Sequence, residues 1–239
     1  MGLLSLFGCC KKAPAYPQDK VVAKDGSEIV FTFLAHASFA IEHNGKHIYI
    51  DPVGEFAWEK MPKADAILVT HSHYDHFEMA TIEKIAGENC AILCDKTSAE
   101  AFEHNCTTML PGCVAEPFEG LSVKAVPAYN ISEGHTDFHP QAREDCGYIV
   151  ELATGLRIYI AGDTELTPEM KALKDIDIAF LPVNQPYTMT VDQAVEAIKE
   201  IRPRIFYPYH YGEVDEVTDI ERLKSELEGI TDVRVFPME

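Results

Sequence analysis

The stretch Ala66-Ile67-Leu68-Val69-Thr70-His71-Ser72-His73-Tyr74-Asp75-His76 joins four apolar residues to three histidines and an aspartate. The apolar run predicts a buried strand, so the polar cluster lies where that strand ends and the chain turns. Three imidazoles and a carboxylate cannot be buried as ordinary core without a large desolvation cost. Neutral imidazole binds zinc well, and a carboxylate is a harder ligand or a base. The stretch therefore predicts a metal site at the edge of a sheet, rather than a chance group of histidines on a surface loop.

The spacing inside this cluster favours two metal ions. His71 and His73 can converge on one ion, whereas Asp75 and His76 can turn toward a second ion nearby. Asp163, after the apolar run Ile158-Tyr159-Ile160, could bridge two ions, although an aspartate there could also serve only as a turn former or a helix N-cap.

A third segment also fits a metal site. His210, in Tyr207-Pro208-Tyr209-His210-Tyr211-Gly212, follows another strand pattern. A single histidine in such a place is more often a packed or surface residue, so this signal is weak alone and gains weight from the cluster at residues 71–76.

Strand and helix patterns alternate along the rest of the chain. Asn44-Gly45 and Thr154-Gly155 predict hairpin turns between apolar runs. Antiparallel hairpins mixed with helices predict an α/β (α+β) fold in which sheets pack in layers with helices outside. We expect strands at residues 29–34, 38–42, 46–50, 66–69, 91–94, 121–126, 147–152, 156–160, 176–181 and 204–207, and helices at residues 77–86, 98–104, 191–201 and 220–227.

The N-terminal segment is set apart from this pattern. Residues 1–10 are apolar and Lys11-Lys12-Ala13-Pro14 follows them, so we expect a leader or a flexible N-terminus over residues 1–20 and one domain over residues 21–239. Leu6-Phe7-Gly8-Cys9 resembles the end of a bacterial lipoprotein signal, but no basic residue precedes the apolar run, which is shorter than usual. We expect a cytoplasmic protein, with a cell-envelope lipoprotein anchored through Cys9 as the alternative.

The composition narrows the class of partner. The formal net charge is -19, from 20 basic and 39 acidic residues. Nucleic-acid binding relies on Lys and Arg to replace the counterions of phosphates, so we expect a small-molecule substrate and no nucleic acid. Contact with a membrane is expected only if the N-terminus is lipidated. A homo-oligomer stays open. The seven cysteines are an odd number spread over a long chain, which does not indicate a disulfide framework.

The order of the motifs T-H-S-H-Y-D-H, A-G-D-T and Y-H-Y-G resembles the metallo-β-lactamase superfamily. The resemblance is strongest to the branch of L-ascorbate-6-phosphate lactonases and N-acyl-phosphatidylethanolamine phospholipases D, and it extends from Leu34-Ala35-His36 to Tyr211-Gly212. It implies a four-layer αβ/βα sandwich with one or two Zn²⁺ ions at the edge of the sheets, and Mn²⁺ or Fe²⁺ is compatible with the same ligands. It implies that His71 and His73 hold the first ion, that Asp75, His76 and His210 hold the second, and that Asp163 bridges them.

The chain departs from the superfamily at one position. A histidine usually follows the strand that here ends in Val126-Pro127, and Asn130 occupies that position. His139 on the same loop is the alternative ligand. Asn130, His139 and Tyr187 are candidates for contacts with the substrate. His36 resembles a pocket residue of the branch, and Asp51 resembles a residue that accepts hydrogen bonds and fixes the histidine loop.

These features predict a hydrolase. A bound metal lowers the pKa of water from about 15.7 toward about 7, and the resulting hydroxide attacks an ester, a lactone or a phosphodiester. Asp75 would orient this nucleophile or take its proton. Two alternatives stay open: an iron-dependent oxidoreductase of the same fold, and a metal-binding protein without catalysis.

Overall fold

The computed structural model describes residues 16–102, 105–212 and 217–238. Within these residues it contains two seven-stranded sheets, with the orders β1-β2-β3-β4-β5-β6-β7 and β14-β13-β12-β11-β10-β9-β8. The strands are β1 (Gln18–Val22), β2 (Glu28–Ala35), β3 (Ser38–His43), β4 (Lys46–Ile50), β5 (Ala64–Val69), β6 (Ala86–Cys94), β7 (Thr107–Thr108), β8 (Val114–Phe118), β9 (Leu121–Pro127), β10 (Cys146–Leu152), β11 (Arg157–Ile160), β12 (Ile178–Pro182), β13 (Ile205–Tyr209) and β14 (Asp232–Val233). The helices are α1 (Met79–Ile85), α2 (Lys96–Ala99), α3 (Pro168–Lys171), α4 (Val191–Ile201) and α5 (Ile220–Glu226), with short 3₁₀ helices at Trp58–Lys60 and Gln141–Arg143.

The two sheets repeat one plan. In the first sheet β1 to β4 are antiparallel, and β4 to β7 are parallel. In the second sheet β8 to β11 are antiparallel, and β11 to β14 are parallel. Parallel neighbours end at the same edge of a sheet, so the segments that follow β11, β12 and β13 emerge together.

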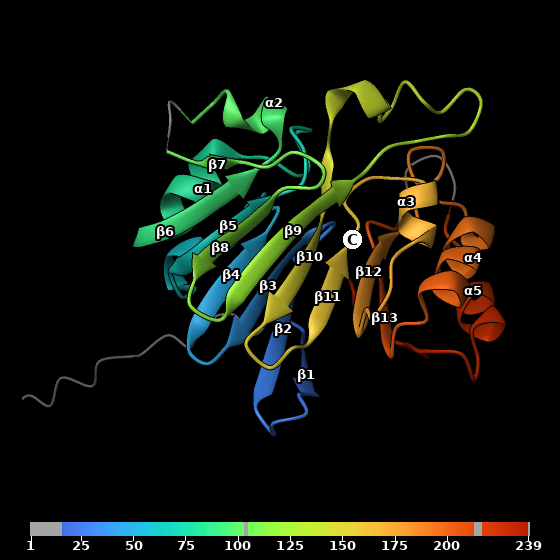
Figure 1. Ribbon diagram of the computed structural model, residues 1–239, viewed down its shortest axis with the longest axis horizontal. Coiled ribbons are helices and arrows are strands. Elements are labelled where there is room, and N and C mark those ends of the chain that lie inside the picture. Colours follow the sequence, from blue (N-terminus) through green and yellow to red (C-terminus); the bar gives the residue numbers. More distant parts are fainter. Residues whose placement is uncertain (1–15, 103–104, 213–216, 239) are drawn as a thin grey trace, which may run out of the picture.

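The main core lies between the two sheets. Phe31, Phe33 and Phe39 of the first sheet are fully buried against the second sheet. The rings of Phe39 and Phe180 stack with centroids 4.2 Å apart, and Phe31 contacts Tyr207 at 5.5 Å. A second cluster packs α4 and α5 on the outer face of β11, β12 and β13, and a third packs α1 on the first sheet. Figure 1 shows these helices on the two outer sides. The predicted four-layer αβ/βα sandwich is confirmed.

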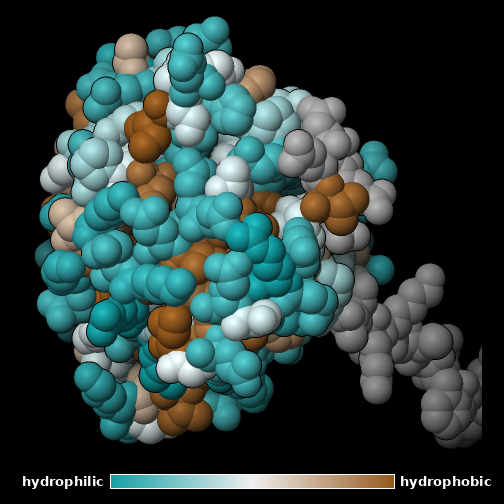
Figure 2. All heavy atoms as spheres, turned by 90° about the vertical axis from the view of Figure 1, so that its right-hand side faces the viewer, coloured by the Kyte–Doolittle hydropathy of each residue, from teal (hydrophilic) through white to brown (hydrophobic). Residues whose placement is uncertain are grey.

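Helix α4 illustrates how the sequence specifies an outer layer. The Thr190 side chain accepts a hydrogen bond from the Gln193 amide, and the Gln193 side chain accepts one from the Thr190 amide, which forms a capping box. Ala194, Ile198 and Ile201 recur at helical spacing and are buried toward the sheet. The opposite side of this layer is mostly hydrophilic, with hydrophobic side chains only in small groups (Figure 2).

Strand β1 corrects the expected boundary of the leader. Residues 18–20, which were expected in the leader, pair with β2 in the first sheet. Asp19 also reaches the second sheet, because its carboxylate accepts hydrogen bonds from the Tyr207 hydroxyl at 2.7 Å and from Arg234 at 2.8 Å. The Tyr16 hydroxyl also accepts a hydrogen bond from the Ala57 amide at 3.1 Å, so the first described residue already contacts the fold. Cys9 lies outside the described residues, and among those described no helix is long and apolar enough to cross a membrane.

One helix prediction was wrong. Residues 98–104 were expected to be helical, but α2 covers only Lys96–Ala99 and residues 100–102 are not helical; residues 103 and 104 lie outside the described part of the chain. It begins at Asp95, whose carboxylate accepts hydrogen bonds from the Thr97 and Ser98 amides. The buried Asp95 is an N-cap, so it fixes the start of the helix two residues earlier than the apolar pattern indicates.

Candidate metal centre

The polar side chains predicted from the strand ends meet at one edge of the sandwich. The cluster at residues 71–76 follows β5 of the first sheet, Asp163 follows β11, and His210 follows β13 of the second sheet. Two further histidines come from loops: His36 from the turn between β2 and β3, and His139 from the segment between β9 and β10. Segments from both sheets and from distant parts of the chain thus supply one site.

The site contains two groups of potential metal ligands. In each group the ligand atoms of four side chains lie within 4.8 Å of one another. Among the described residues, the first group is His71, His73, His139 and Asp163, and the second is His36, Asp75, His76 and His210.

Asp163 lies between the two groups. Its Oδ2 is 3.8 Å from His71 Nε2 and 3.4 Å from His139 Nε2, both of the first group. The same oxygen is 3.1 Å from His210 Nε2, and Oδ1 is 3.3 Å from His76 Nε2, both of the second group. One buried carboxylate therefore faces the imidazoles of both groups, and this arrangement allows it to contact two ions.

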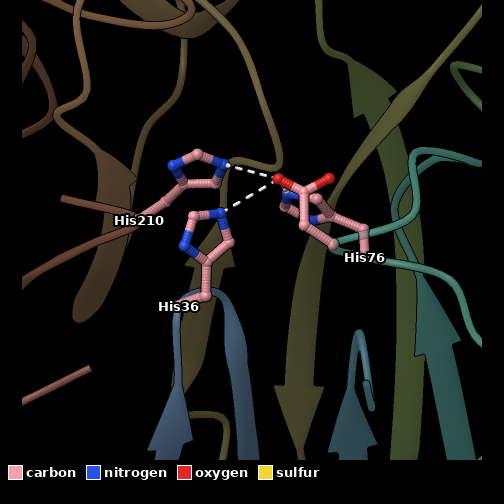
Figure 3. Close-up of side chains that lie close together, drawn as sticks. His36, His76 and His210 are labelled. Atoms are coloured by element: carbon pink, nitrogen blue, oxygen red, sulfur yellow. Dashed lines mark hydrogen bonds and ion pairs between the residues drawn. The ribbon is translucent and has the colours of Figure 1, made fainter. Parts of the chain in front are cut away.

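The second group is centred on Asp75. Its Oδ2 lies 3.0 Å from His36 Nε2, 3.7 Å from His210 Nε2 and 4.0 Å from His76 Nε2. Figure 3 shows His36 and His210 pointing toward one carboxylate from different elements, with His76 next to it. The His36 and His210 rings are in contact, with centroids 3.8 Å apart. Both residues have positive φ values, 56° and 45°, in the left-handed region that L residues rarely adopt. The backbone is thus held in uncommon conformations at the two positions that bring these imidazoles together.

Several atoms at the site are buried without a hydrogen-bond partner. These atoms include His76 Nε2, His210 Nε2 and Asp163 Oδ1. Buried polar atoms are nearly always paired with a hydrogen-bond partner. A set of unpaired nitrogen and oxygen atoms that face one another therefore fits a site for metal cations. The residues present are also of the right chemistry, since imidazole and carboxylate suit zinc and other first-row metals.

The protonation states of the imidazoles also fit a metal site. Burial lowers the pKa of His71 well below its usual value and lowers the pKa of His139 to about 4. Both are therefore neutral at neutral pH, the form that binds metals. Burial also lowers the pKa of His76, but the carboxylates of Asp163 and Asp51 outweigh it and hold that pKa well above its usual value. Without a metal, a proton on His76 balances these charges, so metal binding would release it.

The structure places His139, and not Asn130, among the imidazoles. The Asn130 side-chain nitrogen donates to the backbone oxygens of Tyr187 at 2.7 Å and His135 at 3.2 Å. The backbone N–H of Asn130 donates to the His139 carbonyl at 2.9 Å. Asn130 therefore holds the loop that carries His139, whose Nε2 faces Asp163.

A pocket of about 510 Å³ opens over both ligand groups. His36 and Tyr187, which the sequence analysis proposed, lie in its wall. Five members of the ligand groups, His73, Asp75, His139, Asp163 and His210, also line it, and the other wall residues are Tyr74, Asp137, Phe138 and Asn184. Tyr74, Asp137 and Phe138 were not predicted to be site residues. A signal was present, since Asp137 and Phe138 directly precede His139.

Arg143 was also missed. Its Nη1 lies 2.5 Å from His73 Nε2, and its Nη2 donates to the Ser72 hydroxyl at 3.2 Å. His73 Nδ1 is the nitrogen that faces the first group, 3.1 Å from His71 Nε2. Arg143 thus contacts the nitrogen of His73 that points away from the other ligands.

A family model described as the β-lactamase superfamily domain matches residues 30–210. The chain belongs to this superfamily. A UPF0173 metal-dependent hydrolase from Thermoplasma acidophilum is 35% identical over 207 residues, which cover 80% of this chain and 87% of that protein. A crystal structure from Parabacteroides distasonis, named as a metal-dependent hydrolase, is 41% identical with a TM-score of 0.87 and covers 94% of this chain and 100% of its own. The metallo hydrolase Igni18 from Ignicoccus hospitalis is 25% identical with a TM-score of 0.72, covering 88% of this chain and 95% of its own.

This β-lactamase superfamily member is a metal-dependent hydrolase. A metal-dependent enzyme needs residues that hold an ion, and the two ligand groups contain residues of that kind. The predicted superfamily is confirmed. The narrower resemblance to the lactonase and phospholipase branch stays a prediction.

In this superfamily member, Asp51 holds the loop at residues 71–76 in place through buried hydrogen bonds. It is fully buried, and its carboxylate accepts hydrogen bonds from the Thr70 amide and hydroxyl, both at 2.7 Å. The same carboxylate lies 2.9 Å from His76 Nδ1, which directs His76 Nε2 toward Asp163. Asp51 thereby fixes both the start of the loop and the ring of one candidate ligand.

We expect Asp51→Ala to weaken metal binding by about 10–100-fold, the usual cost of losing an outer contact to a metal ligand. It should also lower the free energy of unfolding by about 1–3 kcal/mol, because buried donors lose their acceptor. Competition with a chelator and urea unfolding measure the two effects. Asp65→Asn is a control at an aspartate of the same sheet, half-exposed and paired with Lys46. Unchanged metal affinity in Asp51→Ala would contradict the proposed support.

Proposed function

We propose that the chain is a dinuclear hydrolase that uses a metal-activated water to cleave an ester, a lactone or a phosphodiester. His71, His73 and His139 would hold one ion, Asp75, His76 and His210 the other, and Asp163 both. The observation that carries the proposal is the position of Asp163 between two groups of imidazoles, at the floor of an open pocket.

We propose zinc as the metal because both groups are rich in imidazole; Mn²⁺ and Fe²⁺ suit the same donors less specifically. A bound divalent ion supplies a Lewis acid and lowers the pKa of a bound water to about 7. The remaining contributions come from the side chains of the chain itself.

Asp75 has the geometry of an orienting group. Burial raises its pKa, but the imidazoles of His210 at 3.7 Å and His36 at 3.0 Å outweigh this effect and hold the pKa far below its usual value. A carboxylate with so low a pKa is a weak base, so Asp75 would hold a water by accepting its hydrogen bond rather than take its proton. Its side chain reaches the pocket, where an attacking water would lie.

His36 supports this role of Asp75. Its Nε2 lies 3.0 Å from the Asp75 carboxylate, and its own pKa is lowered by burial. A neutral His36 that donates to Asp75 would fix the carboxylate and leave its second oxygen for the water. We therefore propose a positioning role for His36 rather than a role as a principal metal ligand.

The first test is the metal content of protein purified without added metal. We expect about two ions per chain, and chelator-sensitive hydrolysis of at least one of 4-nitrophenyl acetate, a γ-lactone and bis(4-nitrophenyl) phosphate. Adding Zn²⁺ back should restore it. Measurement of iron and manganese in the same sample identifies the native metal. Full activity after complete removal of metal, or two bound ions without turnover of any of the three, would count against the proposal.

A further inference from the structure

We propose that the pocket selects substrates whose non-reacting group is uncharged or positively charged, and that it rejects substrates in which this group is an anion. The inference rests on the proposed hydrolase function, because it concerns the part of the substrate that lies beside the metal site.

The charges of the pocket wall are the first observation. Among the described residues that line it, Asp75, Asp137 and Asp163 are acidic, and none is Lys or Arg. Asp75 and Asp163 face the imidazoles, so bound ions would engage both carboxylates. Asp137 belongs to neither ligand group and is exposed. Its negative charge therefore stays available to the part of the substrate outside the metal site.

The second observation is that Arg143, a basic side chain beside the site, is paired with other residues of the chain. Arg143 contacts His73 and Ser72, and its Nε lies 3.3 Å from the buried carboxylate of Asp145. Arg143 is not among the residues that line the pocket. A phosphate or carboxylate on the substrate would thus enter without a guanidinium or ammonium partner from the described wall. This argues against a phosphate-bearing lactone, which the resemblance to the lactonase branch would suggest.

The third observation is that aromatic residues of the wall favour uncharged and cationic groups. Tyr74 is 90% exposed, although it lies between His73 and Asp75 in the middle of the ligand loop. Phe138 and Tyr187 meet edge to face, with centroids 4.8 Å apart and planes at 68°. Aromatic rings beside a carboxylate attract alkyl groups by burial and alkylammonium groups by cation–π contact. An anion gains neither attraction from the faces of these rings.

Three acetate esters of similar size test the charge preference: acetylcholine, 3,3-dimethylbutyl acetate and 2-sulfoethyl acetate. We expect kcat/KM, divided by each ester's rate of alkaline hydrolysis, to be highest for the cation and at least about tenfold lower for the anion than for the neutral ester. Asp137→Lys should shift the cation-to-anion ratio by at least about tenfold toward the anion.

The control variant is Glu133→Lys. Glu133 is also exposed and lies on the same loop, but it does not line the pocket, so this variant makes the same change in net charge outside the wall. We expect it to change the ratio by less than about twofold at 0.15 M salt, where charges beyond about 8 Å are screened. An equal shift in both variants, or equal turnover of the three esters by the unaltered enzyme, would overturn the inference.

Binding separates this inference from the proposed function. Choline, 3,3-dimethylbutanol and 2-hydroxyethanesulfonate are the alcohols of the three esters, and ligand-observed NMR measures their binding with or without turnover. If no ester is cleaved but choline binds and 2-hydroxyethanesulfonate does not, the charge preference stands and ester hydrolysis fails. If the esters are cleaved but the sulfonate binds as well as choline, the charge preference fails and the hydrolase proposal stands.

Discussion

Asp163→Asn should remove most of the bound metal and lower hydrolysis by about a thousandfold or more, because water without a metal keeps a pKa of about 15.7 instead of about 7. Asparagine preserves the shape of the side chain but loses the negative charge, and its NH₂ group cannot act as a ligand. Asp163 is within 4 Å of four imidazoles, two from each ligand group. Its loss should therefore affect both ions, unlike the loss of any one histidine.

Elemental analysis and the rate on a substrate cleaved by the unaltered enzyme measure this effect. Asp175→Asn is a matched control, because Asp175 is exposed and has a φ of 57°, a conformation that asparagine tolerates well. The control should keep its metal and its rate. An Asp163→Asn protein that keeps two ions and most of its activity would exclude a bridging role.

His139→Ala should reduce the metal content from about two ions to about one, with a loss of activity of about a hundredfold. Its Nε2 faces Asp163, and its ring lies 5.2 Å from that of His71 and 4.9 Å from that of His73. The other ligand group does not include His139, so its ion should stay bound.

Two variants on the same loop test the assignment of His139. His135→Ala replaces a part-exposed histidine that contacts Glu165, and it should keep both ions. Asn130→Ala loosens the loop but leaves every member of the two ligand groups in place, so we expect it to retain both ions with weaker affinity. The loss of one ion in Asn130→Ala, with two retained in His139→Ala, would reverse the assignment and restore Asn130 as the ligand.

The sequence predicts much of the fold because strong local patterns determine it. The helix at residues 191–201 was predicted with its bounds, since a capping box and an apolar face coincide there. The central strands were predicted because they are continuous apolar runs. By contrast, β7 and β14 have two residues each, and β8 contains Glu116 and Pro117, two residue types that are uncommon in strands. Such strands form because a long sheet already exists beside them, and short sequence windows do not contain that information.

The site was predictable to the extent that strands deliver its residues. The cluster at residues 71–76, Asp163 and His210 all follow strands directly, so the sheet fixes where they meet. His139 lies within the long segment between β9 and β10, where no hydrophobic period sets its direction. Its position depends on contacts from elsewhere, such as the Glu165 carboxylate, which accepts hydrogen bonds from the Ile131 and Ser132 amides at 2.7 and 2.6 Å.

The origin of the candidate ligands in both sheets has a consequence for the stability of the whole molecule. Ions held among His71, His76, Asp163 and His210 would cross-link the two halves of the sandwich at the edge where the inter-sheet core ends. A metal that binds the folded chain and not the unfolded chain adds about 2.7 kcal/mol to the stability of the fold when its free concentration is one hundred times Kd. Resistance to heat and proteolysis would then vary with the supply of metal in solution, so the same groups that prepare the chemistry would also link folding to metal supply by mass action.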